Sequence, residues 1–268
     1  MCNAAVELTT HDGIAQVRLS HAGKFNAMSR PMWQQLCGVF QGIQKAHDVR
    51  CVVLLGADGN FCAGGDISEY PSFRFDPVSL REFHERDVWG GLQAMLDCDV
   101  PIVAQIQGHC MGAGLEMACC CDIRIASTSA RFGAPIAHLG FPMAPREARL
   151  VGRELGLALA RELLLTARVL DAPSMRERGF LHHVYEEHDL LQQVQSVAQR
   201  IASLAPQAAR LNKQTLRAMQ VYPDVFGAQA DAAAQTLSSS LSAYRYAAGA
   251  EHHEGIDAFL NKRKPVFK

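Results

Sequence analysis

The stretch GHCMGAGLEMACCCDI, residues 108–123, follows the apolar run VPIVAQIQ and contains a carboxylate, Glu116, whose neighbours are small or apolar. An earlier stretch, GNFCAGGDISEY at residues 59–70, follows the apolar run CVVLLG in the same way. Continuous apolar runs of this kind predict strands that are buried on both faces, and the small residues predict tight turns after them. Glycine and alanine let a ligand approach backbone N–H groups that lack a partner at a helix start. We therefore expect two neighbouring turns whose amides can point at one oxygen.

Taken alone, each turn could have no role beyond letting a helix pack closely against a sheet. Gly108, Gly112 and Gly114 are spaced as G-x-x-x-G-x-G, which differs from the G-x-G-x-x-G spacing of dinucleotide sites. The spacing argues against a nucleotide-dependent oxidoreductase.

Strand and helix patterns alternate through the first half of the chain. AAVELTT and IAQVRLS flank HDG, which predicts a hairpin. Ser29 can cap a helix whose apolar positions recur at helical spacing, and a second helix is expected over residues 78–98. DIRIAS, after the second turn, predicts a third buried strand. Alternation at this spacing predicts crossover units and a parallel sheet.

The second half is mostly helical from about Arg146, with one short strand expected around HHVYEE. We expect an α/β core over residues 1–200 and a helical C-terminal section over residues 201–268.

Composition limits the possible functions. The chain has 268 residues, 49% of them hydrophobic, and a net charge of −1, which argues against a general nucleic-acid surface. No apolar stretch is long enough to cross a membrane, and the N-terminus has no signal-peptide pattern. The nine cysteines show no metal-ligand spacing, so we expect reduced thiols, no metal and a cytoplasmic location.

GNFCAGGDI, QGHCMGAGLEMACCCDIRIAS and ARFGAPIAHLG, taken together, resemble the crotonase, or enoyl-CoA hydratase/isomerase, superfamily. The resemblance extends from the HAGKFNAM loop to the FLNKRKPVF ending. It implies an α/β fold, a crotonase-like spiral of ββα units, with a helical C-terminal trimerisation section. It also implies a homotrimer or hexamer that acts on an acyl-CoA thioester, with coenzyme A as part of the substrate and no separate cofactor.

The same resemblance implies the roles of individual residues. The backbone amides of Gly65 and Ala113 would form an oxyanion hole for the thioester oxygen, and Glu116 would be a catalytic acid/base. Residues implied to contact coenzyme A or the acyl group are Lys24, Ala27, Ala63, Asp66, Ile67 and Lys262.

One position departs from the family pattern. The resemblance implies a second hydratase glutamate where this chain has Ile136, and a further position that some isomerases fill with Asp lies near Met143. Glu147 opens a helix, and we attribute it to the helix dipole. Other possible acids or bases, none of them favoured individually, are His84, Glu85, His109 and His138.

The leading expectation is therefore an enoyl-CoA hydratase-like enzyme with one acid/base residue and weak or altered activity. The alternatives are isomerase, decarboxylase or thioester hydrolase chemistry, and an acyl-CoA binder without catalysis, which Ile136 favours.

Overall fold

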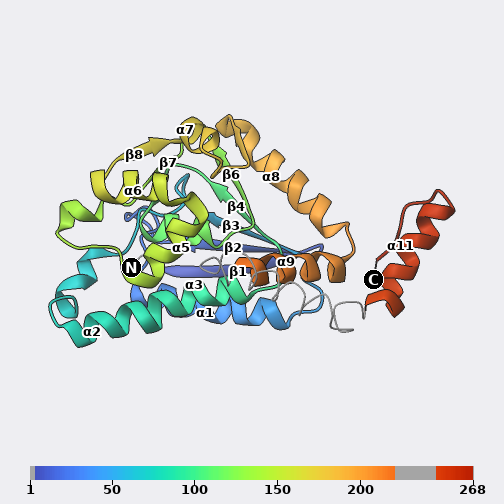
Figure 1. Ribbon diagram of the computed structural model, residues 1–268, viewed down its shortest axis with the longest axis horizontal. Coiled ribbons are helices and arrows are strands. Elements are labelled where there is room, and N and C mark those ends of the chain that lie inside the picture. Colours follow the sequence, from blue (N-terminus) through green and yellow to red (C-terminus); the bar gives the residue numbers. More distant parts are fainter. Residues whose placement is uncertain (1–3, 221–245, 268) are drawn as a thin grey trace, which may run out of the picture.

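The computed structural model describes residues 4–220 and 246–267, and a six-stranded sheet runs through its centre (Figure 1). The strand order is β1-β2-β3-β4-β6-β9. β1 is antiparallel to β2, and each later pair in this sheet is parallel. The predicted parallel sheet is thus confirmed, and its strands are β1 Ala5–His11, β2 Ile14–Ser20, β3 Cys51–Gly56, β4 Ile102–Ile106, β6 Ile123–Ser127 and β9 His183–Tyr185.

The β1–β2 hairpin turns at Asp12 and Gly13, which both have positive φ angles, 50° and 75°. His11 pairs with Ile14, so these two residues form the whole turn. A two-residue turn with positive φ at both positions matches the twist of antiparallel strands and favours Asp-Gly. The hairpin predicted around HDG is confirmed.

Helix α1, Arg30–Lys45, joins β2 to β3. The Ser29 hydroxyl accepts a hydrogen bond from the Met32 amide at 3.4 Å, which caps the helix start as predicted. Trp33 and Phe40 lie on the buried face of α1, which packs against α3 on one side of the sheet (Figure 1).

The second crossover differs from the expected single helix over residues 78–98. It consists of α2 Pro77–Glu82, a π-helical segment η2 Phe83–Val88 and α3 Trp89–Asp97, without a break in the chain. A π-helical turn adds a residue to the helical repeat and rotates the side chains that follow. Buried Asp87 in this segment accepts hydrogen bonds from Arg30 Nε at 2.5 Å and Gln34 Nε2 at 2.9 Å. These bonds fix η2 against α1.

A second, three-stranded sheet was not predicted. It is formed by β5 His109–Met111, β7 Arg131–Gly133 and β8 Val169–Asp171. Three residues are too few to show an alternating pattern, so periodicity alone could not find these strands. β5 leads directly into α4, Ala113–Cys119, and therefore positions the second turn.

The C-terminal half is helical, as expected. Helix α8 packs on the face of the sheet opposite α1 and α3, where Leu190 and Val194 contact Val53 and Val103 (Figure 1). Arg50 donates hydrogen bonds to the carbonyls at 202 and 267 and so links the end of the chain to the core. No helix in the described ranges is long and apolar enough to cross a membrane. The helices of this half are α5 Pro145–Leu155, α6 Leu157–Thr166, α7 Ala172–Glu177, α8 Glu187–Ala202, α9 Pro206–Gln220 and α11 Ala250–Leu260.

Candidate active site

The first small-residue turn pairs with the loop before α1. The Met28 amide donates to the Gly64 carbonyl and the Asp66 amide donates to the Met28 carbonyl, both at 2.8 Å. In an extended segment the N–H groups of successive residues point to opposite sides. The Gly65 N–H therefore points away from Met28, and it has no protein acceptor among the described residues.

The second turn lies directly against the first. The Cys62 amide donates to the His109 carbonyl at 2.7 Å, and the Met111 amide donates to the Cys62 carbonyl at 2.9 Å. A Cβ atom on Gly114 would lie 2.5 Å from the Cys62 carbonyl oxygen, so this close approach requires glycine. Ala113 is the first residue of α4, and its amide has no acceptor within the helix. The contact between the two turns, which the sequence predicted, is thus present.

A cavity of about 210 Å³ opens beside both turns. Its lining brings together Gly65, Ala113 and Glu116 with aromatic and aliphatic side chains. Ile136 and Met143 also line this cavity and bring apolar side chains to it.

Glu116 lies in the first turn of α4 and is buried. Burial, and after it the nearby Glu147 carboxylate, raises the pKa of Glu116 to about 8. A carboxyl group with this pKa is mostly protonated at neutral pH and can exchange a proton with substrate or water in that range.

Glu147 is more than a residue at a helix start. It does lie in the first turn of α5, as expected, but it is only 2% exposed. Its Oε1 lies 3.0 Å from Nδ1 of His84, and its buried Oε2 has no hydrogen-bond partner in the described structure. His84, on η2, lines the same cavity as Glu116. A favourable interaction with the helix dipole does not by itself explain why the Glu147 carboxylate is buried.

The other acid/base candidates lie elsewhere. His138 is exposed and does not line the cavity. His109 is exposed and contacts Asn60 through Nδ1 at 2.7 Å. Glu85 forms an ion pair with Arg146 outside the cavity lining.

Two residues that line the cavity, Tyr70 and Arg74, were not predicted from the sequence. Tyr70 lies beside the first turn, because a Cβ on Gly65 would meet its hydroxyl at 2.3 Å. Burial raises the pKa of Tyr70, so the phenol is neutral at physiological pH. The Arg74 guanidinium lies 3.5 Å from the centre of the Phe141 ring and 4.5 Å from that of Tyr70. No periodicity in PSFRFDP signals that Arg74 faces the cavity, because this segment has no regular helix or strand pattern.

The loop before α1 approaches the first turn, as the resemblance implies. Lys24 Nζ donates to Asp66 Oδ2 at 2.7 Å and to Ser68 Oγ at 2.8 Å. Burial acts to raise the pKa of Asp66, but hydrogen bonds from Lys24 and Ser68 outweigh it, so the pKa is lowered and the residue is charged. The Ala63 amide donates to the carbonyl at position 25 at 3.0 Å.

The structure brings most of the expected substrate-binding residues together around the first turn. Ala27 is buried in the same loop as Lys24, and Ile67 is exposed at the rim of the cavity. Lys262 follows α11, which Figure 1 shows at the opposite end of the molecule from α2. Lys262 is therefore not brought to the turns within one chain.

The cysteines of the described ranges do not provide a nucleophile. The eight described cysteines are free thiols, and seven of them are buried. Burial is the main cause that raises the pKa of Cys62, next to the first turn, to about 12. A thiol of this kind is not ionised at neutral pH and does not attack a thioester.

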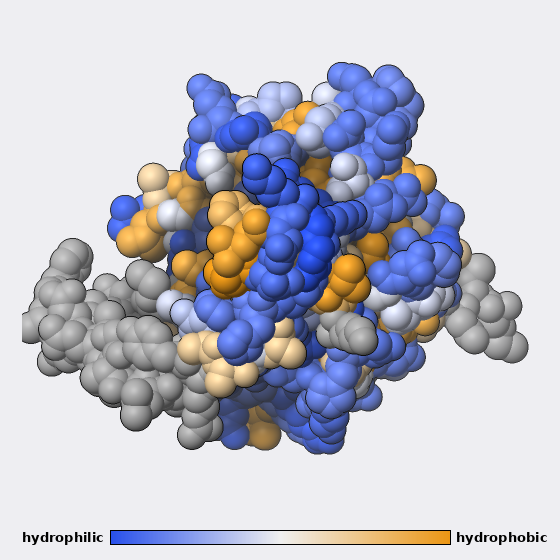
Figure 2. All heavy atoms as spheres, turned by 90° about the vertical axis from the view of Figure 1, so that its right-hand side faces the viewer, coloured by the Kyte–Doolittle hydropathy of each residue, from blue (hydrophilic) through white to orange (hydrophobic). Residues whose placement is uncertain are grey.

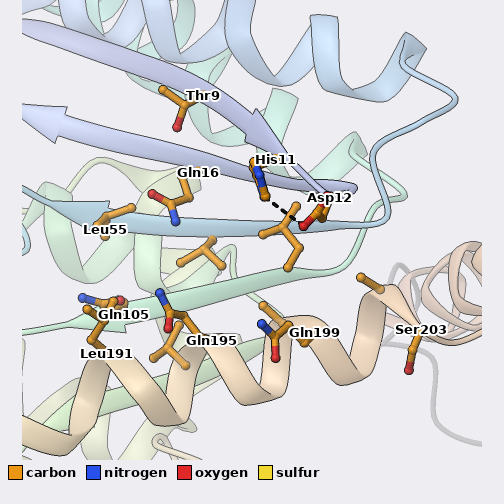
Figure 3. A pocket seen from close by; sticks show the side chains of 15 residues that line it. Thr9, His11, Asp12, Gln16, Leu55, Gln105, Leu191, Gln195, Gln199 and Ser203 are labelled. Atoms are coloured by element: carbon orange, nitrogen blue, oxygen red, sulfur yellow. Dashed lines mark ion pairs between the residues drawn. The ribbon is translucent and has the colours of Figure 1, made fainter.

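A larger cavity, of about 580 Å³, lies between α8 and the sheet (Figure 3). Gln16 and Gln105 from the sheet and Gln195 and Gln199 from α8 line it, together with aliphatic side chains. Its ion pair, His11 with Asp12, is exposed at the hairpin tip. Neutral carboxamides cannot transfer protons, so the smaller cavity, which contains Glu116 and the two free amides, is the candidate active site.

Comparison with known proteins gives a consistent result. The model of the enoyl-CoA hydratase/isomerase family matches residues 9–268. The short-chain-enoyl-CoA hydratase of Clostridium acetobutylicum is 29% identical, over 94% of this chain and 92% of that protein. The 2,3-dehydroadipyl-CoA hydratase of Escherichia coli K12 is 30% identical, over 91% and 90%. The crystal structure of an enoyl-CoA hydratase/carnithine racemase from Magnetospirillum magneticum superposes with a TM-score of 0.89 at 32% identity, over 98% and 95%.

Proposed function

The chain belongs to the enoyl-CoA hydratase/isomerase family and has its crotonase fold, and from this premise we propose that it hydrates a 2-enoyl-CoA thioester. One observation carries the proposal. Two turns in direct contact bring Gly65 and Ala113, whose amides have no acceptor among the described residues, into the lining of a cavity that also contains the buried acid Glu116. This combination suits a reaction in which charge develops on a thioester oxygen while a proton moves nearby.

The two amides would bind the thioester carbonyl oxygen. When water adds to the β-carbon, the electrons of the double bond move onto this oxygen and form an enolate. Fixed backbone donors stabilise such a charge without reorganisation, and each donor contributes about 2.7–4 kcal/mol to the transition state. Because Gly65 and Ala113 act through their backbones, their side chains need only be small.

Glu116 would complete the reaction by transferring a proton. Its raised pKa keeps the carboxyl protonated at neutral pH, so it can protonate the α-carbon of the enolate. The attacking water releases one proton as its oxygen bonds to the β-carbon, so the products are a 3-hydroxyacyl-CoA, this proton and the Glu116 carboxylate. Glu116 then regains a proton from the solvent, and the net change is the addition of one water. No cofactor beyond the coenzyme A of the substrate takes part in this proposal.

The coenzyme A portion is assigned to the loop and first turn, through Lys24, Ala27, Ala63, Asp66 and Ile67. Their clustering around Gly65 supports this assignment. Lys262 can contribute only from a neighbouring subunit, which agrees with the proposed trimer or hexamer. Figure 2 shows hydrophobic side chains gathered on the face that carries α11, where Ile256, Phe259 and Leu260 are exposed.

Loss of the conjugated thioester absorbance of crotonyl-CoA tests the proposal. We expect wild type to consume this substrate and Glu116→Gln to be at least about 100-fold slower, as for the loss of a positioned acid. Equal slow rates in both proteins would reject hydration at this site.

A binder without catalysis is the second candidate, and Ile136 favours it because isoleucine cannot transfer a proton. Tight binding of acyl-CoA without turnover, across a panel that also tests isomerisation, decarboxylation and thioester hydrolysis, would support this alternative.

A further inference from the structure

Arg74 places a positive charge in the candidate active site. It follows the short helix η1, Ile67–Ser72, and its amide donates to the Tyr70 carbonyl at 2.8 Å. Its guanidinium lies over the rings of Phe141 and Tyr70, which hold it at the cavity wall. Stacking on two aromatic faces fixes the group but leaves its N–H donors available.

This guanidinium has no anionic partner in the described parts of the chain. Other partly buried arginines are satisfied either by a carboxylate, as Arg30 is by Asp87, or by backbone carbonyls, as Arg210 is at positions 46 and 49. Burial lowers the pKa of Arg74, which shows that water only partly solvates the charge, but the group stays protonated.

The charge of the cavity is therefore unbalanced. Glu116 is the carboxyl group among the lining residues, and it is mostly neutral at pH 7. A neutral acyl chain that filled this space would remove more water from Arg74 without offering an acceptor, which is unfavourable. A chain that carries a carboxylate would supply two acceptor oxygens in the geometry that guanidinium prefers.

We propose that Arg74 binds a carboxylate at the far end of the acyl chain, so that the substrates are 2-enoyl-CoA thioesters of dicarboxylic acids. The inference rests on the proposed function and narrows its substrate class. Tyr70 sets the distance, because its hydroxyl lies beside Gly65 while its ring lies under the guanidinium. The carboxylate site is thus one tyrosine side chain away from the thioester oxygen site, which fits a short chain.

Matched substrate pairs test this inference. We would compare trans-2-hexenoyl-CoA with hex-2-enedioyl-CoA, and trans-2-pentenoyl-CoA with pent-2-enedioyl-CoA, which differ only in the terminal carboxylate. We expect wild type to favour a carboxylated member at least about tenfold in kcat/KM. Arg74→Met should abolish this preference, and Arg74→Lys should keep part of it. Arg81→Met, which removes an exposed cation on α2, is the control and should keep the full preference.

Binding of the saturated analogues adipyl-CoA and hexanoyl-CoA, measured by calorimetry, separates the two proposals. If wild type hydrates both members of each pair equally and binds both analogues equally, the carboxylate site is refuted and hydration stands. If no substrate is hydrated but adipyl-CoA binds more tightly through Arg74, hydration fails and the carboxylate site stands.

A second inference rests on a different observation, the contact of the partly buried His84 with the buried Glu147. Glu147 is buried, and one of its carboxylate oxygens has no hydrogen-bond partner in the described structure. Its other oxygen contacts Nδ1 of His84. The ring of His84 therefore presents Nε2 as its remaining nitrogen. A carboxylate that orients the imidazole of a cavity residue is the usual arrangement for a general base.

We infer that His84 is the second proton-transfer residue of the proposed hydration, and that Glu147 is its positioning residue. Water forms a bond from its oxygen to the β-carbon and gives a proton to His84 Nε2, while Glu116 gives its proton to the α-carbon. The imidazolium then loses its proton to solvent and Glu116 regains one, so the net change is the addition of one water. This pair would replace the glutamate that is absent at Ile136.

Chemical rescue tests the role of His84. We expect His84→Ala to lower kcat by about 100-fold or more with KM little changed, and added imidazole to restore turnover in a saturable way. His138→Ala, which removes an exposed histidine outside the cavity, is the control and should behave like wild type. A folded His84→Ala with full activity, or with a loss that imidazole does not restore, overturns the inference.

Glu147→Gln separates positioning from structural support. We expect it to lower kcat with KM unchanged, and Glu147→Asp to recover part of kcat. If Glu147→Gln changes only the melting temperature, the positioning role is refuted. If wild type hydrates none of the enoyl-CoA substrates, the role of His84 as the second proton-transfer residue is refuted together with hydration; if wild type hydrates them and His84→Ala does so equally well, only the role of His84 is refuted.

Discussion

Glu116 links the chemistry of the site to the stability of the fold. Its pKa rises from an ordinary value of 4.5 to about 8 in the folded protein, through burial and then the Glu147 carboxylate. Between these values the folded state holds a proton that the unfolded state has lost. The stability that this group contributes is therefore fully present below about pH 4.5 and is lost as the pH rises through 8.

The first prediction follows from that sign. Glu116→Gln stays neutral, so between pH 5 and pH 8 its free energy of unfolding should increase relative to wild type by up to about 4 kcal/mol. Urea unfolding of both proteins across this range measures the difference. Glu82→Gln, at an exposed position, is the control and should show no such trend. A Glu116→Gln difference that stays constant with pH would mean that the folded carboxyl titrates normally.

Gly114 gives a second prediction at this scale. An alanine there would place Cβ 2.5 Å from the Cys62 carbonyl oxygen, a backbone atom that cannot move without separating the two turns. We expect Gly114→Ala to lower stability by about 1–3 kcal/mol and to reduce hydration. Gly38→Ala, on the exposed side of α1 where nothing lies within 4 Å, should instead stabilise by about 0.5–1 kcal/mol. Equal effects of both substitutions would contradict the close contact.

Residues that act through local sequence could be predicted, and residues that act through distant contacts could not. Gly65, Ala113 and Glu116 belong to two short segments whose small residues, and the carboxylate of Glu116 among apolar neighbours, are visible in the sequence. His84 and Glu147 are 63 positions apart, and only folding shows that they touch. For this reason the sequence indicated Glu147 as a helix-terminal charge and gave no sign of its imidazole partner.

At the scale of elements, the π-helical segment η2 is the feature that positions His84. Asp87 holds this segment to α1 through Arg30 and Gln34, and it is buried. We predict that Asp87→Asn, which weakens both bonds, lowers stability by about 1–3 kcal/mol and lowers kcat more than it changes KM. Thermal unfolding and steady-state kinetics measure the two effects.

An exposed pair on the neighbouring turn serves as the control. Glu82 and Arg86 form an ion pair at the surface, so Glu82→Ala should change stability by no more than about 0.5 kcal/mol and leave kcat unchanged. If Asp87→Asn changes stability and kcat as little as this control does, the position of η2 does not depend on the hydrogen bonds between Asp87 and α1.

Elements with a long, clear pattern were the predictable ones. The hairpin, α1, β3 and β4 each combine several apolar positions with a turn or cap signal. The irregular helix over residues 77–97 keeps the apolar stripe of an ordinary helix, so its π-helical turn is set by tertiary bonds such as those of Asp87. The strands of the small sheet depend on pairing with one another rather than on their own three residues.

At the scale of the whole molecule, assembly decides whether the site is complete. Lys262 lies away from the two turns of its own chain, and α11 exposes Phe259 and Leu260 at 81% and 72%. We predict a trimer or hexamer of the 29.3 kDa chain, in which subunit contacts cover this apolar surface. Light scattering after gel filtration should show that the double substitution Phe259→Glu with Leu260→Glu lowers the mass toward one chain and weakens acyl-CoA binding. His253→Glu, which adds one acidic side chain at an exposed polar position of α11, is the control and should keep the assembly. A monomeric wild type with full activity would refute any role for a neighbouring subunit.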